Sequence, residues 1–181
     1  MTARIIFLHG PSSCGKSTLA RALQAQIEKP FWHISIDHLR DAGVLPTARY
    51  RSGEFDWPAD RAAFFDGFHR SLGAYAEAGN NLIVEHILDM PGGIEQLKGV
   101  FAPFDVFFVG LHTSLDTLTA REEARGDRPI GSAAADFDSV HKGRVYDIEL
   151  SGEADLDENV GTLLAAWRRD ERRSEFVQAS L

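Results

Sequence analysis

The sequence has 181 residues, 44% of them hydrophobic, and a net charge of −8, which suffices for one domain with a sizeable core and is short for two. The acidic balance argues against DNA or RNA as the main partner, because nucleic-acid backbones are bound by basic surfaces. The single cysteine, Cys14, excludes an intramolecular disulfide, and no apolar run approaches the ~20 residues that span a bilayer. We therefore expect one cytoplasmic domain over residues 1–181, without a nucleic-acid or membrane partner.

The apolar pattern predicts strands and helices in alternation. Continuous apolar runs at residues 5–8, 82–84 and 106–111 indicate strands covered on both faces, as in a parallel sheet. Weaker strand patterns and helical patterns complete the alternation: strands at 31–36 and 146–150, and helices at 16–27, 59–77, 94–101, 114–125 and 155 to about 169. This order predicts an α/β fold of three layers, with helices on both faces of a sheet of about five parallel strands.

The segment between the first strand and the first helix has the pattern G-x-x-x-x-G-K-[ST], formed by Gly10, Gly15, Lys16 and Ser17. In such a loop the backbone N–H groups point at phosphate, the lysine reaches the β- and γ-phosphates, and the hydroxyl ligates Mg²⁺. We predict that ATP and Mg²⁺ bind here, with Lys16 catalytic and exposed before nucleotide binds. The predicted nucleotide-binding residues of the loop are Gly10, Pro11, Ser12, Ser13, Cys14, Gly15, Lys16, Ser17 and Thr18. A turn whose glycines serve packing alone is the alternative, and it leaves Lys16 and Ser17 unexplained.

Asp37 ends the second strand pattern, where a carboxylate would face the glycine-rich loop across the top of the sheet. A kinase needs a group there to accept the proton of the attacking hydroxyl. Asp37 is therefore a candidate catalytic base and substrate ligand. The pattern is equally consistent with an Asp37 that only caps a helix starting at His38.

Two segments, 43–58 and 126–143, interrupt the alternation. Ligands of open α/β sheets bind beyond the carboxyl ends of the strands, and both segments could border such a site. The first would form a substrate-side loop whose candidate substrate contacts are Arg49, Tyr50, Phe55 and Trp57. An ordinary surface loop is the alternative.

The third strand ends in Glu85-His86. A carboxylate at this place commonly holds Mg²⁺ through water, so Glu85 joins Ser17 as a predicted metal ligand. His86 is a candidate substrate contact, although a lone histidine near a sheet end is more often a packing residue.

Arg121, Arg125 and Arg128 are spaced four and three residues apart, and they share a helix face if the helix persists. A glycine and a proline nearby predict a break, which favours a short lid over residues 126–143. Arg125 and Arg128 would then clamp the transferred phosphate, and Arg121 would contact the nucleotide. The alternative is a solvated helix face paired with the neighbouring glutamates.

Five motifs occur in order along the chain: GPSSCGKST, SIDHL, LIVEHIL, AREEARGDR and VHKGRVYDIEL. Together they resemble the chloramphenicol phosphotransferase-like proteins, small P-loop kinases related in fold to shikimate and adenylylsulfate kinases, over about residues 4–150. The resemblance implies ATP-dependent 3-O-phosphorylation of chloramphenicol or a similar small alcohol, as in antibiotic resistance. It assigns Asp37 as the catalytic base and Arg125 and Arg128 as lid residues. The antibiotic-modifying members carry a carboxylate pair where this chain has Glu85-His86, so the reaction class carries over more readily than the antibiotic.

Two other functions remain open from the sequence. A nucleotide or nucleotide-sugar kinase, including toxin-like kinases, would use Arg49 and Arg51 to bind a phosphate of its acceptor. A nucleotide-binding switch would hydrolyse ATP or GTP slowly and signal by a change of shape. The sequence lacks an N-K-x-D guanine motif, which disfavours the switch.

Overall fold

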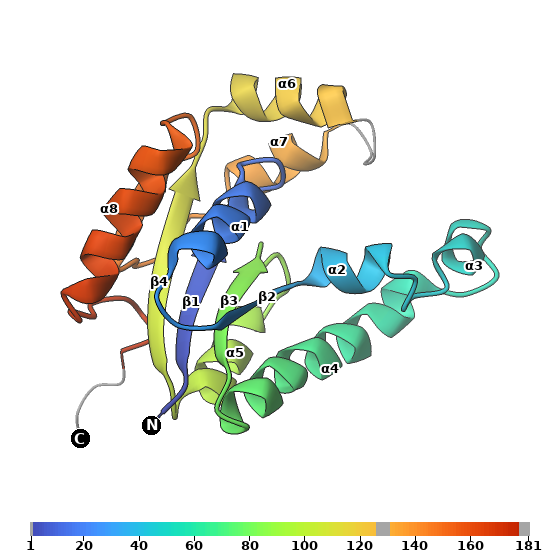
Figure 1. Cartoon of the computed structure of the whole chain (residues 1–181). Helices are drawn as coiled ribbons and strands as arrows, with labels where there is room; N and C mark the ends of the chain where they lie inside the picture. The colour runs from blue at the N-terminus through green and yellow to red at the C-terminus, as the bar shows by residue number, and fades with distance from the viewer. Residues whose placement is uncertain (1, 126–130, 178–181) are drawn as a thin grey trace.

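The computed structural model of the chain describes residues 2–125 and 131–177 (Figure 1). At its centre is a five-stranded sheet of order β2-β3-β1-β4-β5, in which all pairs of neighbouring strands are parallel. The strands are β1 (Arg4–His9), β2 (Phe31–Ser35), β3 (Asn81–His86), β4 (Asp105–His112) and β5 (Ile148–Ser151). The α/β fold and the number of parallel strands expected from the sequence are confirmed.

Helices cover both faces of this sheet (Figure 1). They are α1 (Lys16–Gln26), α2 (Ile36–Asp41), α3 (Thr47–Arg51), α4 (Trp57–Glu77), α5 (Gly93–Phe101), α6 (Leu115–Arg125), α7 (Ser132–Phe137) and α8 (Leu156–Arg168). Apolar side chains of α1 and α8 belong to one core cluster, and those of α4 and α5 belong to a second. The three layers are therefore α1/α8, the sheet, and α4/α5. Among the described residues, no helix has both the length and the apolar character needed to cross a bilayer.

Strand β1 shows why the central strands have continuous apolar sequences. Its side chains alternate between the two clusters: Ile6 and Leu8 pack toward α1 and α8, and Ile5 and Phe7 pack toward α4 and α5. All four are fully buried. A strand between two helical layers needs an apolar side chain at every position, whereas a half-exposed strand needs one at every second position.

The register of the sheet brings three chain segments to one edge. Glu85 pairs with Leu8 of β1 on one side and with Ser35 of β2 on the other. The carboxyl ends of β1, β2 and β3 are therefore level. The segments that follow them, which carry the glycine-rich loop, α2 and the Glu85-His86 pair, meet at this edge.

Several element boundaries differ from the sequence expectation. Helix α4 begins at Trp57 instead of residue 59, because the Asp56 carboxylate caps the Ala59 N–H at 3.4 Å and proline is favoured in a first helical turn. Segment 43–58 is accordingly not one loop, since it contains α3 and the start of α4. In segment 126–143, residues 126–130 lie outside the described residues and the remainder contains α7.

Asp37 neither ends the second strand nor caps a helix starting at His38. Strand β2 stops at Ser35, whose hydroxyl accepts the Asp37 N–H at 3.2 Å and so caps α2. Asp37 lies in the first turn of that helix. A carboxylate is favourable there because the first helical turn carries unpaired N–H groups and a partial positive charge.

Candidate functional site

The glycine-rich loop, residues 10–15, joins β1 to α1 in a conformation that its glycines make possible. A side chain at Gly10 would have its Cβ 2.5 Å from the Leu111 carbonyl oxygen and 2.9 Å from Cys14 Sγ. Gly15 has a φ of 104°, in the left-handed region that glycine adopts without strain. It is the N-cap of α1 and caps the helix without a side chain, and the first turn of α1 contains no acidic residue. The positive end of α1 is therefore available to an anion in the loop.

Lys16 is folded back into the loop. Its Nζ donates hydrogen bonds to the carbonyl oxygens of Gly10, at 2.8 Å, and Pro11, at 2.7 Å, and its side chain is largely buried. The expectation of an exposed lysine is therefore wrong. A buried ammonium group needs acceptors, and here the loop carbonyls provide them. A bound phosphate would have to replace these carbonyls as partner of Lys16.

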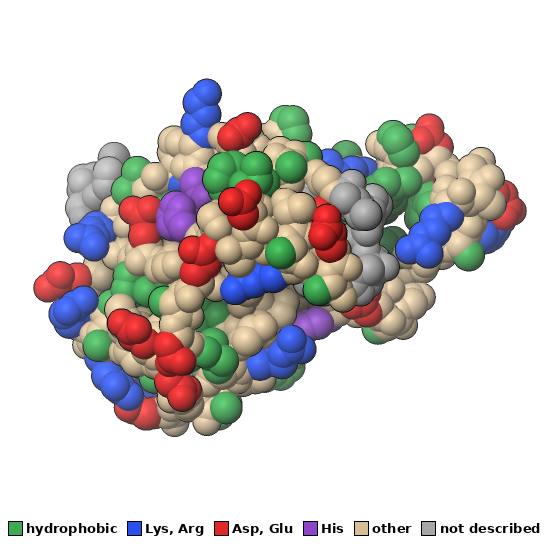
Figure 2. All heavy atoms as spheres, turned by 90° about the horizontal axis from the view of Figure 1, so that it is seen from above, with side chains coloured by type: hydrophobic (Ala, Val, Ile, Leu, Met, Phe, Trp, Pro, Cys, Tyr) green, Lys and Arg blue, Asp and Glu red, His purple; other side chains and the backbone are tan. Residues whose placement is uncertain are grey.

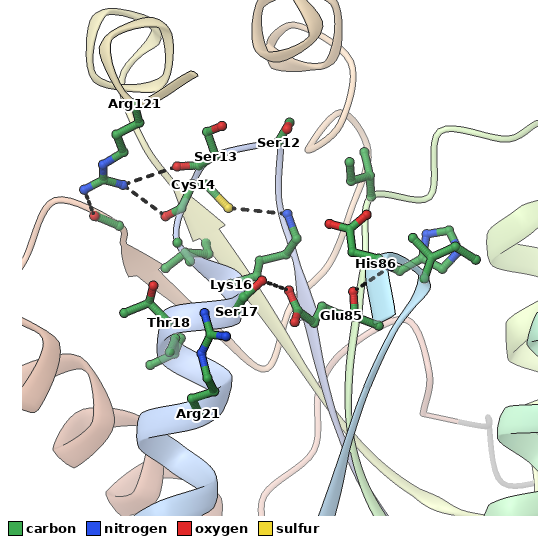
Figure 3. A pocket seen from close by; sticks show the side chains of 18 of the residues that line it. Ser12, Ser13, Cys14, Lys16, Ser17, Thr18, Arg21, Glu85, His86 and Arg121 are labelled. Atoms are coloured by element: carbon green, nitrogen blue, oxygen red, sulfur yellow. Dashed lines mark hydrogen bonds between the residues drawn. The ribbon is translucent and has the colours of Figure 1, made fainter. Parts of the chain in front are cut away.

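Ser17 and Glu85 meet directly. The Ser17 hydroxyl donates to Glu85 Oε2 at 2.7 Å (Figure 3). His33 Nε2 donates to the other carboxylate oxygen. Burial alone would raise the pKa of Glu85, but the hydrogen bonds from His33 and Ser17 outweigh it and lower that pKa below its usual value. Glu85 is thus an ionised carboxylate beside the Ser17 hydroxyl, and the assignment of both as metal ligands stays a prediction.

The loop opens into a cleft of about 760 Å³ that also reaches α2 and the end of β3. Residues 12–18 line one part of it. Gly10 and Pro11 are not among the lining residues, and their carbonyl oxygens accept hydrogen bonds from Lys16. Asp37, His38 and Asp41 of α2 line another part. The cleft therefore brings together the predicted nucleotide-binding loop and the predicted catalytic base, which are separated by some twenty residues in the chain.

Arg40 accompanies the two aspartates of α2. Its Nη1 lies 3.1 Å from Asp37 Oδ1, and its Nε donates to Asp41 Oδ1 at 2.8 Å. All three side chains are partly exposed to solvent, so these ion pairs hold orientation more than they add stability. Asp37 keeps its carboxylate at the cleft while the neighbouring guanidinium balances part of its charge.

Arg121 reaches the loop from α6 (Figure 3). Its guanidinium donates to the carbonyl oxygens of Ser13 and Cys14, at 3.4 Å each, and to that of Gly152, at 2.8 Å. The neighbouring Glu122 is buried and accepts the Gly131 N–H at 2.7 Å. The alternative of a solvated helix face is therefore wrong for both residues, and Arg121 instead holds the loop against the segment after β5.

Of the two predicted lid arginines, the structure describes only the backbone of Arg125. Arg125 is the last residue of α6, and its side chain lies outside the described part of the structure. Arg128 lies outside the described residues altogether. The assignment of both to a phosphate-clamping lid stays a prediction.

The predicted substrate contacts of segment 43–58 do not line the cleft. They pack against one another around α3, which forms a lobe beyond the N-terminal end of α4 (Figures 1 and 2). The Tyr50 ring lies 5.8 Å from the ring of Phe55 and 5.2 Å from that of Trp57, and the Arg49 guanidinium lies 3.8 Å above Phe55. Arg49 also pairs with Glu54. These contacts account for the aromatic and basic composition of the segment within the lobe itself.

His86 lies in the wall of the cleft with both ring nitrogens engaged. Its Nδ1 accepts the Leu88 N–H at 2.8 Å, so the ring proton is on Nε2, which donates to His69 Nε2 at 3.0 Å. His69 Nδ1 in turn donates to Gln96 Oε1 at 2.7 Å. Burial, followed by the charges of His69 and Lys16, lowers the pKa of His86 to about 3, so the ring is neutral near pH 7. This arrangement favours a packing role over contact with substrate.

The motif residues His141 and Tyr146, to which the sequence assigned no role, form a buried network with His9. The Tyr146 hydroxyl lies 2.8 Å from His9 Nδ1 and 2.7 Å from His141 Nδ1. Burial lowers the pKa of His9 and raises that of Tyr146. The Tyr146 ring occupies the space above Gly110, where a Cβ would lie 2.8 Å from ring carbons. The network fixes the segment before β5 against β1 and β4.

His33 is a site residue that the sequence analysis missed. A single histidine in a weak strand pattern carries no functional signal by itself. The available signal was positional, because His33 and Ser35 share one face of β2 and Ser35 pairs with Glu85. That signal can be used only when the order of the strands is known.

Comparison with known proteins gives one family. The family model described as "Chloramphenicol phosphotransferase-like protein" matches residues 3–167. Among curated proteins, "Putative O-phosphotransferase MT2714" and "Putative O-phosphotransferase Rv2636", from two strains of Mycobacterium tuberculosis, are each 30% identical to this chain. Each match covers 83% of this chain and 76% of the relative.

Several solved structures with a similar fold are kinases of small molecules. The adenylylsulfate (APS) kinase CysC of M. tuberculosis, in complex with AMPPNP and APS, matches with a TM-score of 0.69 at 19% identity, over 92% of this chain and 98% of that one. A gluconokinase from Sinorhizobium meliloti gives 0.65 at 21% identity and 93% coverage of both chains. Shikimate kinase from Acinetobacter baumannii, in complex with shikimate, gives 0.65 at 15% identity, over 95% and 97% of the two chains. At these identities the likeness shows a common P-loop kinase fold.

Proposed function

The chain belongs to the chloramphenicol phosphotransferase-like family and is an O-phosphotransferase with a P-loop kinase fold, and on this premise we propose that it transfers the γ-phosphoryl group of ATP to a hydroxyl of a small uncharged alcohol. Chloramphenicol or a related compound is the acceptor that the family suggests. The observation that carries the proposal is the single cleft that joins the glycine-rich loop to Asp37.

The donor side would bind the triphosphate of ATP. The backbone N–H groups of the loop and the positive end of α1 would face an anion there, and Lys16 would exchange its loop carbonyls for phosphate oxygens. Ser17 and Glu85 offer adjacent hydroxyl and carboxylate oxygens, a donor set that fits Mg²⁺. The ion would neutralise charge on the β- and γ-phosphates during transfer.

The acceptor side would position the attacking hydroxyl. Asp37 lines the cleft and can accept a hydrogen bond from that hydroxyl, which orients its oxygen toward the γ-phosphorus. The phosphoryl transition state is loose, so Asp37 takes the proton late and need not be a strong base. The product would be a phosphomonoester and ADP, with the proton passing through Asp37. Arg125 and Arg128 would complete the site by clamping the transferred phosphoryl group and excluding water.

The charge of the acceptor side favours an uncharged substrate. Asp37 and Asp41 line this part of the cleft, and Arg40 is already engaged by both aspartates. A phosphate on the acceptor would meet these carboxylates and be repelled. The arginines that a nucleotide or nucleotide-sugar kinase would use lie on the α3 lobe, away from the cleft. This distribution disfavours the anionic acceptors left open by the sequence.

A coupled ADP-release assay over a panel of neutral and phosphate-bearing alcohols tests the proposal. We expect at least one neutral alcohol to raise turnover well above the rate with water alone. Asp37→Asn should lower this acceptor-dependent turnover by about 10²-fold, the usual contribution of a positioned base. Asp116→Asn, on the exposed first turn of α6, is the matched control and should change little. If no acceptor raises ADP release above the water background, the proposed function fails.

A further inference from the structure

Two histidines lie beside the Ser17–Glu85 pair. His33 of β2 donates to Glu85, and the His38 ring, from α2, stands nearly perpendicular to the His33 ring, at 78°, with 4.6 Å between ring centroids. One potential ligand atom from each of His33, His38 and Glu85 lies within 4.8 Å of the other two. The His33 and Glu85 side chains are nearly buried, at 6% and 4% exposed, whereas His38 is exposed and lines the cleft.

The fold itself brings the three residues together. Glu85 ends β3 and pairs with Ser35 of the neighbouring β2, and His33 precedes Ser35 by two residues on the same face of that strand. Helix α2 begins directly after β2, so its first turns return His38 over the end of the strand. The cluster takes one residue each from β2, β3 and α2, and each of these elements is fixed by backbone hydrogen bonds.

We propose that His33, His38 and Glu85 form a binding site for a transition-metal ion, with Zn²⁺ as the expected occupant. Two imidazoles and one carboxylate are a donor set of known zinc sites, in which a fourth position is left to water or a substrate. Mg²⁺ prefers oxygen ligands throughout. The cluster is therefore distinct in chemistry from the Ser17–Glu85 oxygen pair, although the two share one carboxylate.

The geometry requires a modest closure on the ion. At zinc bond lengths near 2.1 Å, tetrahedral ligand atoms lie about 3.4 Å apart. The described atoms lie within 4.8 Å of one another, so the exposed His38 would rotate inward by roughly an ångström or more. The proton that His33 Nε2 donates to Glu85 would move to Nδ1 or leave the ring, because a metal ligand needs a free lone pair.

A simpler role for His33 would involve no metal. Its hydrogen bond could merely orient Glu85 toward Ser17, as partners of metal-binding carboxylates commonly do. That role needs no second histidine. His38 therefore separates the two interpretations, because it contributes to a metal site and adds nothing to a hydrogen bond between His33 and Glu85.

The site would also be coupled to nucleotide binding, and this second step rests on the proposed function. Glu85 would serve both ions, and a Zn²⁺ ion bound to it would compete with the Ser17 hydroxyl and the Mg²⁺ of the nucleotide. Each ligand would therefore weaken the other by the same factor.

Metal titration of the tag-free, metal-depleted protein without nucleotide tests the site. We expect one Co²⁺ per chain, with visible absorption typical of nitrogen–oxygen coordination, and one Zn²⁺ by calorimetry. His33→Ala and His38→Ala should each weaken binding by at least about tenfold, since even indirect partners of metal ligands contribute that much. His112→Ala is the control and should bind as the wild type does, because His112 ends β4, three strands from β2 in the sheet order.

The possible results test the metal site, its coupling to nucleotide binding and the proposed function separately. Absence of stoichiometric Co²⁺ and Zn²⁺ binding, or unchanged affinity in His38→Ala, overturns the site. His38 is exposed, so this variant should fold even if His33→Ala does not, which circular dichroism would show. Zinc binding that is unaffected by MgADP would leave the site standing and overturn the coupling. Failure of the kinase assay with intact zinc binding would count against the proposed function alone.

Discussion

In the donor half of the cleft Lys16 and Glu85 are nearly buried, whereas in the acceptor half the six-residue helix α2 carries only exposed or half-buried side chains. Lys16 is held by two loop carbonyls and Glu85 by two hydrogen-bond donors. Asp37 and Asp41 pair with Arg40, and all three side chains are partly exposed. The donor half is therefore part of the buried interior, whereas the acceptor half lies at the surface of the protein.

This difference indicates which half of the site the fold determines. The donor half depends on strand register and on close approaches such as that of Gly10 to Leu111, so a small change there would disturb the sheet edge. The acceptor half can change its side chains without cost to the core. A family built on this plan can keep one phosphoryl donor and vary the alcohol that receives the group.

The largest effect should come from the donor half. Lys16→Ala should lower kcat/KM for phosphoryl transfer by about 10³-fold, because it removes charge stabilisation in the transition state. Thermal stability should change little, since Lys16 itself lines the cleft and water can reach the carbonyls of Gly10 and Pro11 once its side chain is gone. Coupled ADP release and a thermal melt measure the two effects. Lys29→Ala, which removes an exposed lysine, is the control, and retention of more than about a tenth of the activity in Lys16→Ala would contradict its assigned role.

An intermediate effect is expected on the pH dependence of stability. The folded-state pKa of Glu85 is lowered below the ordinary value of 4.5, so its ionised form stabilises the fold above pH 4.5. As the pH falls below 4.5 toward the folded-state pKa, this contribution is lost. Denaturant unfolding of the wild type and of Glu85→Gln should therefore show a stability difference that is constant near pH 7 and shrinks below pH 4.5. A difference that grows on acidification would refute the lowered pKa.

The fold and the donor half were largely predictable from the sequence. Continuous apolar strands and the glycine-rich pattern are local signals, and each specifies an element together with its environment. The errors at the ends of β2 and α4 arose where a cap decides the boundary: Ser35 starts α2 and Asp56 starts α4. Ser35 and Asp56 can be recognised in the sequence as capping residues, but an assignment based on hydrophobic periodicity alone does not take capping into account.

The missed features of the site depend on contacts between distant segments. The burial of Lys16 follows from carbonyls that point inward only once the loop is formed. His33 acquires meaning from the register of β2 against β3. The aromatic residues around α3 are candidate ligand contacts by sequence because they follow the carboxyl edge of the sheet, yet their own ring contacts hold them in a separate lobe.

The smallest effect tests the contrast between the cleft and the α3 lobe. Replacing Arg49 and Arg51 together with alanine should change the acceptor KM of a neutral alcohol by no more than about twofold, since surface substitutions away from a site have small effects. Arg49 already pairs with Glu54 and stacks on Phe55, so its guanidinium group has its partners within the lobe. An acceptor-concentration series at saturating ATP measures this KM. A large rise would mean that the lobe closes over the cleft and contacts the acceptor, which would contradict the separation of the lobe from the site.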